Sequence, residues 1–298
     1  MMLKKEIMKI YKDNNNNEPN NTFLIDNDQI PVDISKIKKV YNISKKLMLE
    51  IMACDIPENF VTIEIDPFGY VNSKRQKKDG ITYFGYDVGQ EREDLCVDYV
   101  LNNRDNNNYY GDGFNERHFM IKYNPDDLLY YIKDLGRGFG TFIKIQEWTE
   151  LRNNLLLNIG ENYIVLSLGE EDDDDKEKEI NNINNNKEEY NSLIIKVFSF
   201  NTEPKSYKIL PSICPVTIGR YNENTIFIDD EMLSRIHCTI DFQNEKWYIQ
   251  DGYAKNGLQE KEIKKSTNGS WIYAYDEIPI VDKMIFKANH NLFICNIV

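Results

Sequence analysis

Short apolar and aromatic runs, separated by turn residues, make up most of the chain. Typical runs are NFVTIEI, HFMIKY, SLIIKVFSF and NLFICNIV, which are rich in Val, Ile, Tyr, Phe and Thr. Runs of this length and composition, bounded by Gly, Asn and Asp, are typical of β-strands. Many short strands at this spacing predict an all-β chain of antiparallel sandwiches or barrels.

One helical pattern interrupts the strands near the N-terminus. Residues 33–52 place apolar side chains at roughly helical spacing, and Asp33 precedes them as a candidate N-cap. The apolar positions are Ile34, Ile37, Val40, Tyr41 and Met48. We expect a helix over this stretch, packed on the first domain with its lysines in solvent.

Two Asn-rich tracts break the strand pattern, at residues 13–21 and 169–190. The second holds ten acidic residues and three lysines between Glu170 and Glu189. Because such a composition buries too little apolar surface to offset its ordering entropy, we expect a flexible linker there. The predicted organisation is an N-terminal extension over 1–45, partly disordered or helical, a domain over 46–168, an acidic linker over 169–191 and a domain over 192–298.

The two predicted domains resemble each other. Residues 116–145 and 234–273 both begin with a polar loop and a histidine, continue through a strand and an aromatic strand that ends in aspartate, and close with a glycine loop and a strand. His118 corresponds to His237, and Asp134 to Asp251. The repeat predicts one sandwich that has been duplicated, with the acidic tract between the copies.

The sequence LGRGFGTF at residues 135–142 superficially matches the glycine-rich ATP loop of protein kinases. Its spacing is G-x-G-x-G, one residue short of the kinase pattern, and no histidine of the chain begins an H-R-D motif. We interpret the glycines as a tight turn between strands, where glycine adopts positive φ at little cost.

Composition narrows the function classes. The net charge of −13 disfavours a nucleic-acid partner. The five cysteines show no C-x-x-C pairing, so we expect reduced thiols in an intracellular protein of the cytoplasm or nucleus, with no metal and no cofactor. No apolar run approaches the length of a membrane span, and no arrangement of side chains forms a catalytic unit. We therefore expect neither an enzyme with a small-molecule substrate nor a membrane protein.

Three motifs in the second copy, in this order, resemble those of the forkhead-associated (FHA) domain. They are Gly219-Arg220, then Ser234-Arg235-Ile236-His237, then Ser266-Thr267-Asn268-Gly269-Ser270. The resemblance implies a sandwich of two twisted antiparallel sheets whose loops at one end bind phosphothreonine peptides. The last residue departs mildly from the family pattern, because serine replaces the usual threonine.

The resemblance also assigns roles by motif. Arg220 and Ser234 would contact the phosphate, and Arg235, Ser266 or Thr267 would add donors. Asn268 would hold the peptide backbone, while Gly219, His237 and Gly269 would shape the loops. The residue types suit the ligand, because arginine and hydroxyl donors match a tetrahedral dianion and an amide pairs with a peptide backbone.

The first copy departs further from the family pattern. Tyr86 follows Gly85 in place of the arginine, Asn115-Glu116 replace Ser-Arg, and Phe139 replaces the asparagine. We therefore expect this copy not to bind phosphopeptides in the family's manner, unless Arg117 and Arg137 compensate.

The sequence thus predicts a tandem, non-catalytic adaptor that reads phosphothreonine on partner proteins. The alternative is a scaffold of two FHA-like sandwiches that binds partners without phosphate. An insertion before Ser266 either repositions the binding loop or adds contacts through lysines. These lysines are Lys255, Lys261, Lys264 and Lys265.

Overall fold

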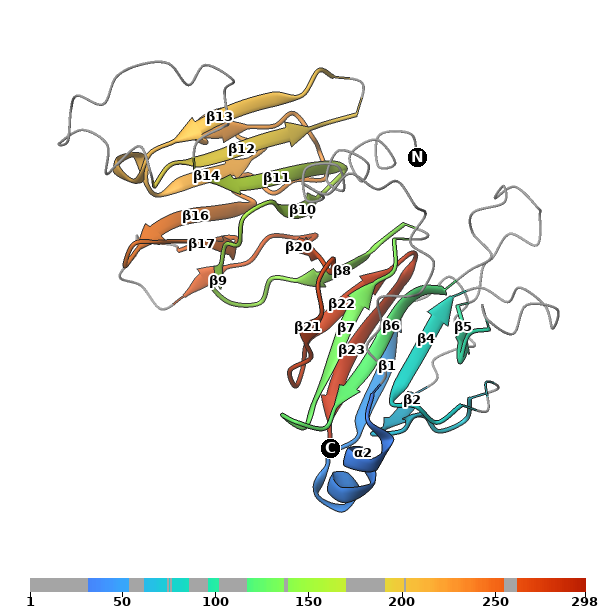
Figure 1. The fold of residues 1–298 in the computed structure, drawn as a ribbon. Helices are drawn as coiled ribbons and strands as arrows, with labels where there is room; N and C mark the ends of the chain where they lie inside the picture. The colour runs from blue at the N-terminus through green and yellow to red at the C-terminus, as the bar shows by residue number, and fades with distance from the viewer. Residues whose placement is uncertain are drawn as a thin grey trace, which may run out of the picture. The chain divides into compact units, whose positions relative to one another are not determined.

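The computed structural model describes residues 32–53, 62–73, 75, 77–85, 96–101, 117–136, 139–169, 191–200, 202–254 and 262–298. Strands dominate these residues, which confirms the predicted all-β class (Figure 1). The two Asn-rich tracts lie outside the described residues, apart from Gly169 at the start of the second. Among the described residues, no helix is long and apolar enough to cross a membrane.

The described chain divides into two compact units. The central unit is Ile145–Ile272, and the terminal unit joins residues 32–144 to Tyr273–Val298. These units do not coincide with the segments 46–168 and 192–298 expected as domains. Residues 145–168 belong to the central unit, and the last 26 residues, Tyr273–Val298, belong to the terminal unit.

The central unit contains two main sheets. Its strands are β9 (Thr149–Glu150), β10 (Leu155–Ile159), β11 (Asn162–Leu168), β12 (Leu193–Phe198), β13 (Lys205–Ile209), β14 (Val216–Gly219), β15 (Ile226–Phe227), β16 (Cys238–Gln243), β17 (Lys246–Asp251), β18 (Tyr253–Ala254), β19 (Ile263–Lys264) and β20 (Ser270–Tyr273), with a 3-10 turn, η4, at Pro211–Ile213. In one sheet the strands of this unit are neighbours in the order β13-β12-β11-β10-β20, and the other sheet has the order β15-β14-β16-β17-β9. Apolar side chains from both sheets, among them Leu157, Ile195, Ile218 and Ile249, are fully buried in the core.

The strands of the terminal unit belong to two sheets. Its elements are α2 (Ile34–Val40), η1 (Tyr41–Ile43), β1 (Leu47–Ala53), β2 (Thr62–Asp66), β3 (Gly69–Tyr70), β4 (Ile81–Gly85), β5 (Tyr99–Val100), β6 (Arg117–Asn124), β7 (Leu129–Asp134), β8 (Thr141–Lys144), β21 (Ile278–Pro279), β22 (Ile285–Ala288) and β23 (Asn291–Ile297). One sheet contains β8-β22-β23-β1-β2-β3, and the other has the order β21-β7-β6-β4-β5.

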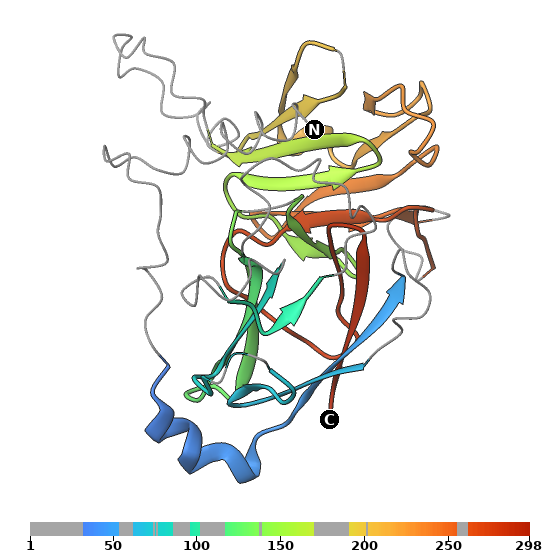
Figure 2. The same cartoon turned by 90° about the vertical axis from the view of Figure 1, so that its right-hand side faces the viewer.

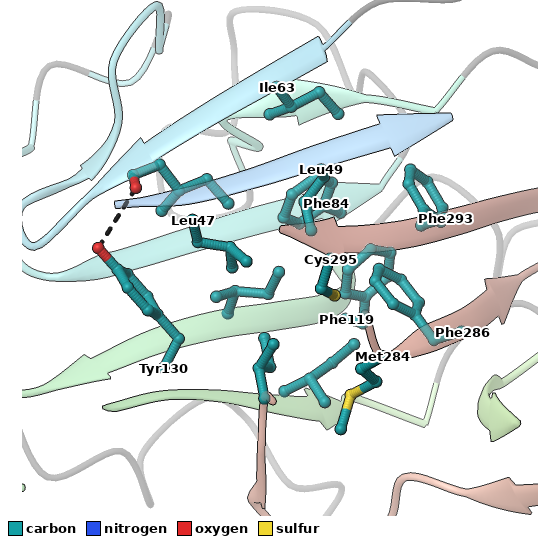
Figure 3. Close-up of a cluster of buried hydrophobic side chains, with 14 of the residues drawn as sticks. Leu47, Leu49, Ile63, Phe84, Phe119, Tyr130, Met284, Phe286, Phe293 and Cys295 are labelled. Atoms are coloured by element: carbon teal, nitrogen blue, oxygen red, sulfur yellow. Dashed lines mark hydrogen bonds between the residues drawn. The ribbon is translucent and has the colours of Figure 1, made fainter. Parts of the chain in front are cut away.

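Aromatic and aliphatic side chains together fill the core of the terminal unit (Figure 3). Phe84 stacks on Phe119 with ring centroids 4.4 Å apart, and Phe286 stacks on Phe293 at 4.7 Å. The hydroxyl of buried Tyr130 donates a hydrogen bond to the backbone carbonyl of Lys45 at 2.8 Å and lies 3.3 Å from that of Ile65. A phenol in a core needs such a partner, because an unpaired buried hydroxyl is costly.

The helix predicted over residues 33–52 is only partly correct. Asp33 caps α2 as expected, since its side chain accepts hydrogen bonds from two backbone N–H groups of the first turn. The second half of the stretch is strand β1, with Leu47 and Leu49 buried. Alternate residues of this half face the core, and pairing with strands on both sides outweighs the helical spacing of Met48.

The residues aligned as a sequence repeat occupy equivalent positions in the two units. Asp134 pairs with the residue after His118, and Asp251 pairs with the residue after His237. The strand that ends in glycine pairs in parallel with a two-residue strand in each unit, through Gly85 and Gly219. The glycines of LGRGFGTF lie in the connection from β7 to β8, where Gly136 and Gly140 adopt positive φ as predicted.

Candidate functional site

The Gly-Arg and Ser-Arg segments of the central unit lie against each other. A Cβ added to Gly219 would lie 2.3 Å from the carbonyl oxygen of Arg235, so only glycine allows this approach. The backbone N–H of Arg220 donates to the carbonyl of Ser234 at 3.2 Å, and that of Tyr221 donates to the carbonyl of Arg235 at 3.3 Å. The backbones of the two expected phosphate-binding residues, Arg220 and Ser234, are therefore held side by side.

His237 joins the Ser-Arg segment to the third motif. Its Nδ1 accepts a hydrogen bond from the backbone N–H of Ser234 at 3.1 Å. Because Nδ1 is the acceptor, Nε2 carries the hydrogen and donates to the carbonyl of Gly269 at 3.1 Å. Burial lowers the pKa of His237 and keeps the ring neutral, as this bonding requires. His237 thus connects the backbone of Ser234 to that of Gly269.

The third motif meets Ser234 directly. The backbone N–H of Thr267 donates to the hydroxyl oxygen of Ser234 at 3.0 Å, and the two hydroxyls lie 3.5 Å apart. The side-chain amide of Asn268 donates to the carbonyl of Met232 at 2.7 Å. Thr267 and Asn268 are exposed, so both expected ligand contacts lie at the protein surface.

Ser266 points into the protein. Its hydroxyl donates to Asp251 at 2.6 Å and accepts from the backbone N–H of Gly269 at 2.9 Å. Its own N–H donates to the other carboxylate oxygen of Asp251 at 3.1 Å. The hydroxyl of Ser270 also donates to Asp251, at 2.8 Å. This buried network shapes the loop and uses the hydroxyl that the motif offered as a phosphate donor.

The two arginines differ from the buried polar residues around them. Arg220 and Arg235 are both exposed. Within the part of the chain that the structure describes, neither guanidinium is held by a hydrogen bond or an ion pair. An arginine in a structural ion pair would already have its charge partner, so these two remain available for an anion.

Asn224 is a loop-forming residue that the sequence analysis missed. Its side-chain amide donates to the carbonyl of Arg235 at 2.6 Å and to that of Tyr221 at 2.7 Å. It thereby ties together the two segments that carry the arginines. Its place four residues after Arg220 is the available sequence signal, since asparagine in a turn commonly bonds nearby backbone.

The inserted lysines are only partly described. Lys255 and Lys261 lie outside the described residues. Lys264 is exposed in β19, and Lys265 donates to the backbone carbonyl of Gln146. The loop is close-packed at its base, where a Cβ on Gly252 would lie 1.9 Å from the carbonyl oxygen of Lys264.

The corresponding region of the terminal unit lacks free cations where it is described. Arg117 donates to the carbonyl of Cys96 at 3.1 Å, and its guanidinium lies 3.7 Å from the ring centre of Tyr83. Arg117 is thus engaged within its own unit. Phe139 replaces the clamping asparagine, and its backbone N–H donates to Asn289 at 2.8 Å. The other departures in this copy, Tyr86, Asn115 and Glu116, lie outside the described residues, as does Arg137.

Among the described residues, no group of three or more His, Cys, Asp or Glu side chains is arranged to hold a metal ion.

Comparison with known proteins gives one family match. No curated protein matches the chain. Residues 216–277, which contain all three motifs, match the family model described as the FHA domain, a phosphothreonine-binding module of protein–protein interaction without catalytic activity.

Proposed function

We propose that the central unit binds phosphothreonine peptides of partner proteins and that the chain acts as a non-catalytic adaptor. One observation carries the proposal. Three loops distant in sequence are bonded together at Ser234, which touches Arg220 through backbone and Thr267 through its hydroxyl. All three loops belong to the matched segment 216–277.

The three loops form a rim that carries Arg220, Ser234, Arg235 and Thr267, and the polar groups of this rim suit a phosphate. The guanidinium of Arg220 and the hydroxyl of Ser234 would contact its oxygens, and Arg235 and Thr267 would add donors. The contact of the Ser234 hydroxyl with that of Thr267 is long, at 3.5 Å, so a phosphate oxygen would easily replace it. We leave Ser266 out of this set because its hydroxyl already bonds Asp251 and Gly269.

Asn268 would hold the peptide backbone beside the phosphothreonine. One N–H of its amide is used on Met232, which fixes the orientation of the side chain. The amide oxygen accepts no hydrogen bond from any described residue. It can therefore accept from a peptide N–H of the partner.

We infer further that the terminal unit is a divergent FHA copy that does not bind phosphate. Support comes from the shared strand order and from the equivalent positions of His118 and His237. The arginine of the motif is absent from this copy, and Arg117 is held by Cys96 and Tyr83. This copy would then serve as a packing unit or as a phosphate-independent interaction surface.

Titration calorimetry with peptides tests the proposal. A degenerate phosphothreonine peptide library selects a ligand, which is then compared in phosphorylated, unphosphorylated and phosphoserine forms. Hydrogen bonds to charged groups contribute about 1.5–3 kcal/mol, so Arg220→Ala should weaken binding by about ten- to hundredfold.

Arg152→Ala is the matched control, because Arg152 is another exposed arginine of the central unit and lies outside the motifs. It should leave the dissociation constant unchanged. Binding that ignores dephosphorylation, or that survives Arg220→Ala, would instead support the phosphate-independent scaffold.

A further inference from the structure

The two units have the same order of neighbouring strands in one of their sheets, although the matching strands come from different parts of the chain. In the central unit, β12 lies between β13 and β11, and β11 is followed by β10 and β20. In the terminal unit, β1 lies between β2 and β23, and β23 is followed by β22 and β8. The hairpin β10–β11 therefore has the same place in its sheet as the hairpin β22–β23 has in the other.

The correspondence holds residue by residue. Each hairpin reverses between its first strand and an asparagine, with Ile159 opposite Asn162 in one and Ala288 opposite Asn291 in the other. Counting from these asparagines, Leu166 corresponds to Cys295. Leu166 pairs with Ile195 of β12, and Cys295 pairs with Leu49 of β1. All four side chains are buried.

In the sequence, each hairpin comes after the repeat of one unit but pairs with strands of the other unit. Hairpin β10–β11 comes directly after the first repeat, yet it pairs with β12 of the second. Hairpin β22–β23 comes after the second repeat, yet it pairs with β1 of the first. Figure 1 and Figure 2 show the consequence, since the blue strand β1 lies beside the red C-terminal strand. The short strands β9 and β21 follow the same rule, pairing with β17 and β7.

The exchanged hairpin β10–β11 touches the loop that precedes Ser234. The side-chain amide of Asn162 donates to a carboxylate oxygen of Asp230 at 2.6 Å, and the backbone N–H of Glu161 donates to the same oxygen at 3.0 Å. The other oxygen of Asp230 accepts from the N–H of Met232 at 2.7 Å. Asp230 thus connects the hairpin to Met232, whose backbone carbonyl accepts the hydrogen bond from the side chain of Asn268.

The turn of this hairpin fits the loop closely. Gly160 adopts a φ of +54°, and a Cβ there would lie 2.5 Å from Asp230 and 3.0 Å from Leu233. Leu233 is buried and directly precedes Ser234. The close approach of Leu233 to Gly160 and the bond from Asn162 to Asp230 therefore limit the positions that the site loop can take.

We propose that the two repeats exchange their last strands within one chain. The hairpin of residues 155–168 then completes the central sandwich and positions the phosphopeptide-binding loop through Asp230. The consequence for binding rests on the proposed function, whereas the exchange itself does not. The central unit would therefore depend on residues that precede the acidic tract, and residues 192–298 alone would lack part of their sheet.

Crosslinking between introduced cysteines tests the exchange without any ligand. Glu50 lies opposite Ile294 in the observed pairing. Lys196 lies opposite Val165, so Lys196 would lie opposite Ile294 if no exchange occurred. A short bis-maleimide is applied at low protein concentration to Glu50→Cys/Ile294→Cys and to the matched control Lys196→Cys/Ile294→Cys, and linked peptides are identified by mass spectrometry.

We expect a 50–294 link in the monomer and no 196–294 link. A 196–294 link, or the absence of a 50–294 link, would overturn the exchange. A 50–294 link confined to covalent dimers would place the exchange between two copies and would also contradict the proposal. None of these outcomes depends on phosphopeptide binding, so failure of the exchange is distinguishable from failure of the proposed function.

Asn162→Ala tests the positioning role. Loss of its bond to a carboxylate should weaken binding of the selected phosphothreonine peptide by about three- to tenfold. Asn153→Ala is the control, because Asn153 bonds backbone at the opposite end of the hairpin, at Leu168. Equal weakening by both variants, or by neither, would contradict a specific role for Asn162.

Discussion

At the scale of single residues, the candidate site is shaped by groups that would not touch the ligand. Gly219 permits the close approach of two loops, and His237 bonds both Ser234 and Gly269. Asp251 holds the base of the third loop through Ser266. The exposed groups expected to meet phosphate are thus placed by a buried frame, which limits the ordering cost of binding.

The pKa of His237 predicts how the stability of the central unit depends on pH. Burial lowers this pKa in the folded protein, so the unfolded chain binds the proton more readily. The contribution of neutral His237 to the free energy of unfolding is therefore complete above the unfolded pKa of about 6.5. This contribution is lost as the pH falls from there through the lower pKa of the folded protein. Urea unfolding followed by fluorescence between pH 7.5 and pH 5 measures the effect.

A His237→Gln variant lacks this titration and is the control. It should be less stable than the wild type at pH 7.5, and the difference should shrink as the pH falls. A difference that is constant with pH would show that His237 does not titrate in this range.

At the scale of elements, local sequence predicts strands well but not their partners. The apolar spacing of the run from Leu47 to Ile51 fits both the helical and the strand period, and its pairing with a strand on each side stabilises the strand. The exchange could not be predicted at all. Residues such as Leu166 and Cys295 have equivalent positions and similar apolar character, so either hairpin fits either sheet by pattern alone.

Core substitutions in the two units should be separable by fluorescence. All three tryptophans, Trp148, Trp247 and Trp271, lie in the central unit. Leu166→Ala should lower the free energy of the unfolding transition that they report by about 2–5 kcal/mol, because it opens a cavity in that core.

Leu49→Ala is the matched substitution, because Leu49 is equally buried but belongs to the core of the terminal unit. Its effect should appear chiefly in far-ultraviolet circular dichroism rather than in fluorescence. A fluorescence transition that responds to Leu49→Ala and not to Leu166→Ala would contradict the assignment of β11 to the central unit.

At the scale of the whole molecule, the three motifs that match the FHA family all lie in one of the two units. The motifs identified from sequence converge in the central unit, with Arg220, Ser234 and Thr267 joined by bonds near Ser234. Sequence did not reveal that Ser266 is turned inward, since its partner Asp251 lies on a distant strand. The sequence also showed no sign of the contact between Asn162 and Asp230. Asn162 lies before residues 192–298, the segment expected as the second domain, and it reaches Asp230 only because its hairpin pairs with β12.

The most direct test of the account is amide chemical-shift mapping of the full chain with the selected phosphothreonine peptide. We predict shifts concentrated at Arg220, Ser234, Thr267 and Asn268, which vanish when the peptide is dephosphorylated. Shifts that persist without the phosphate, or that fall mainly in the terminal unit, would contradict phosphothreonine reading at this rim.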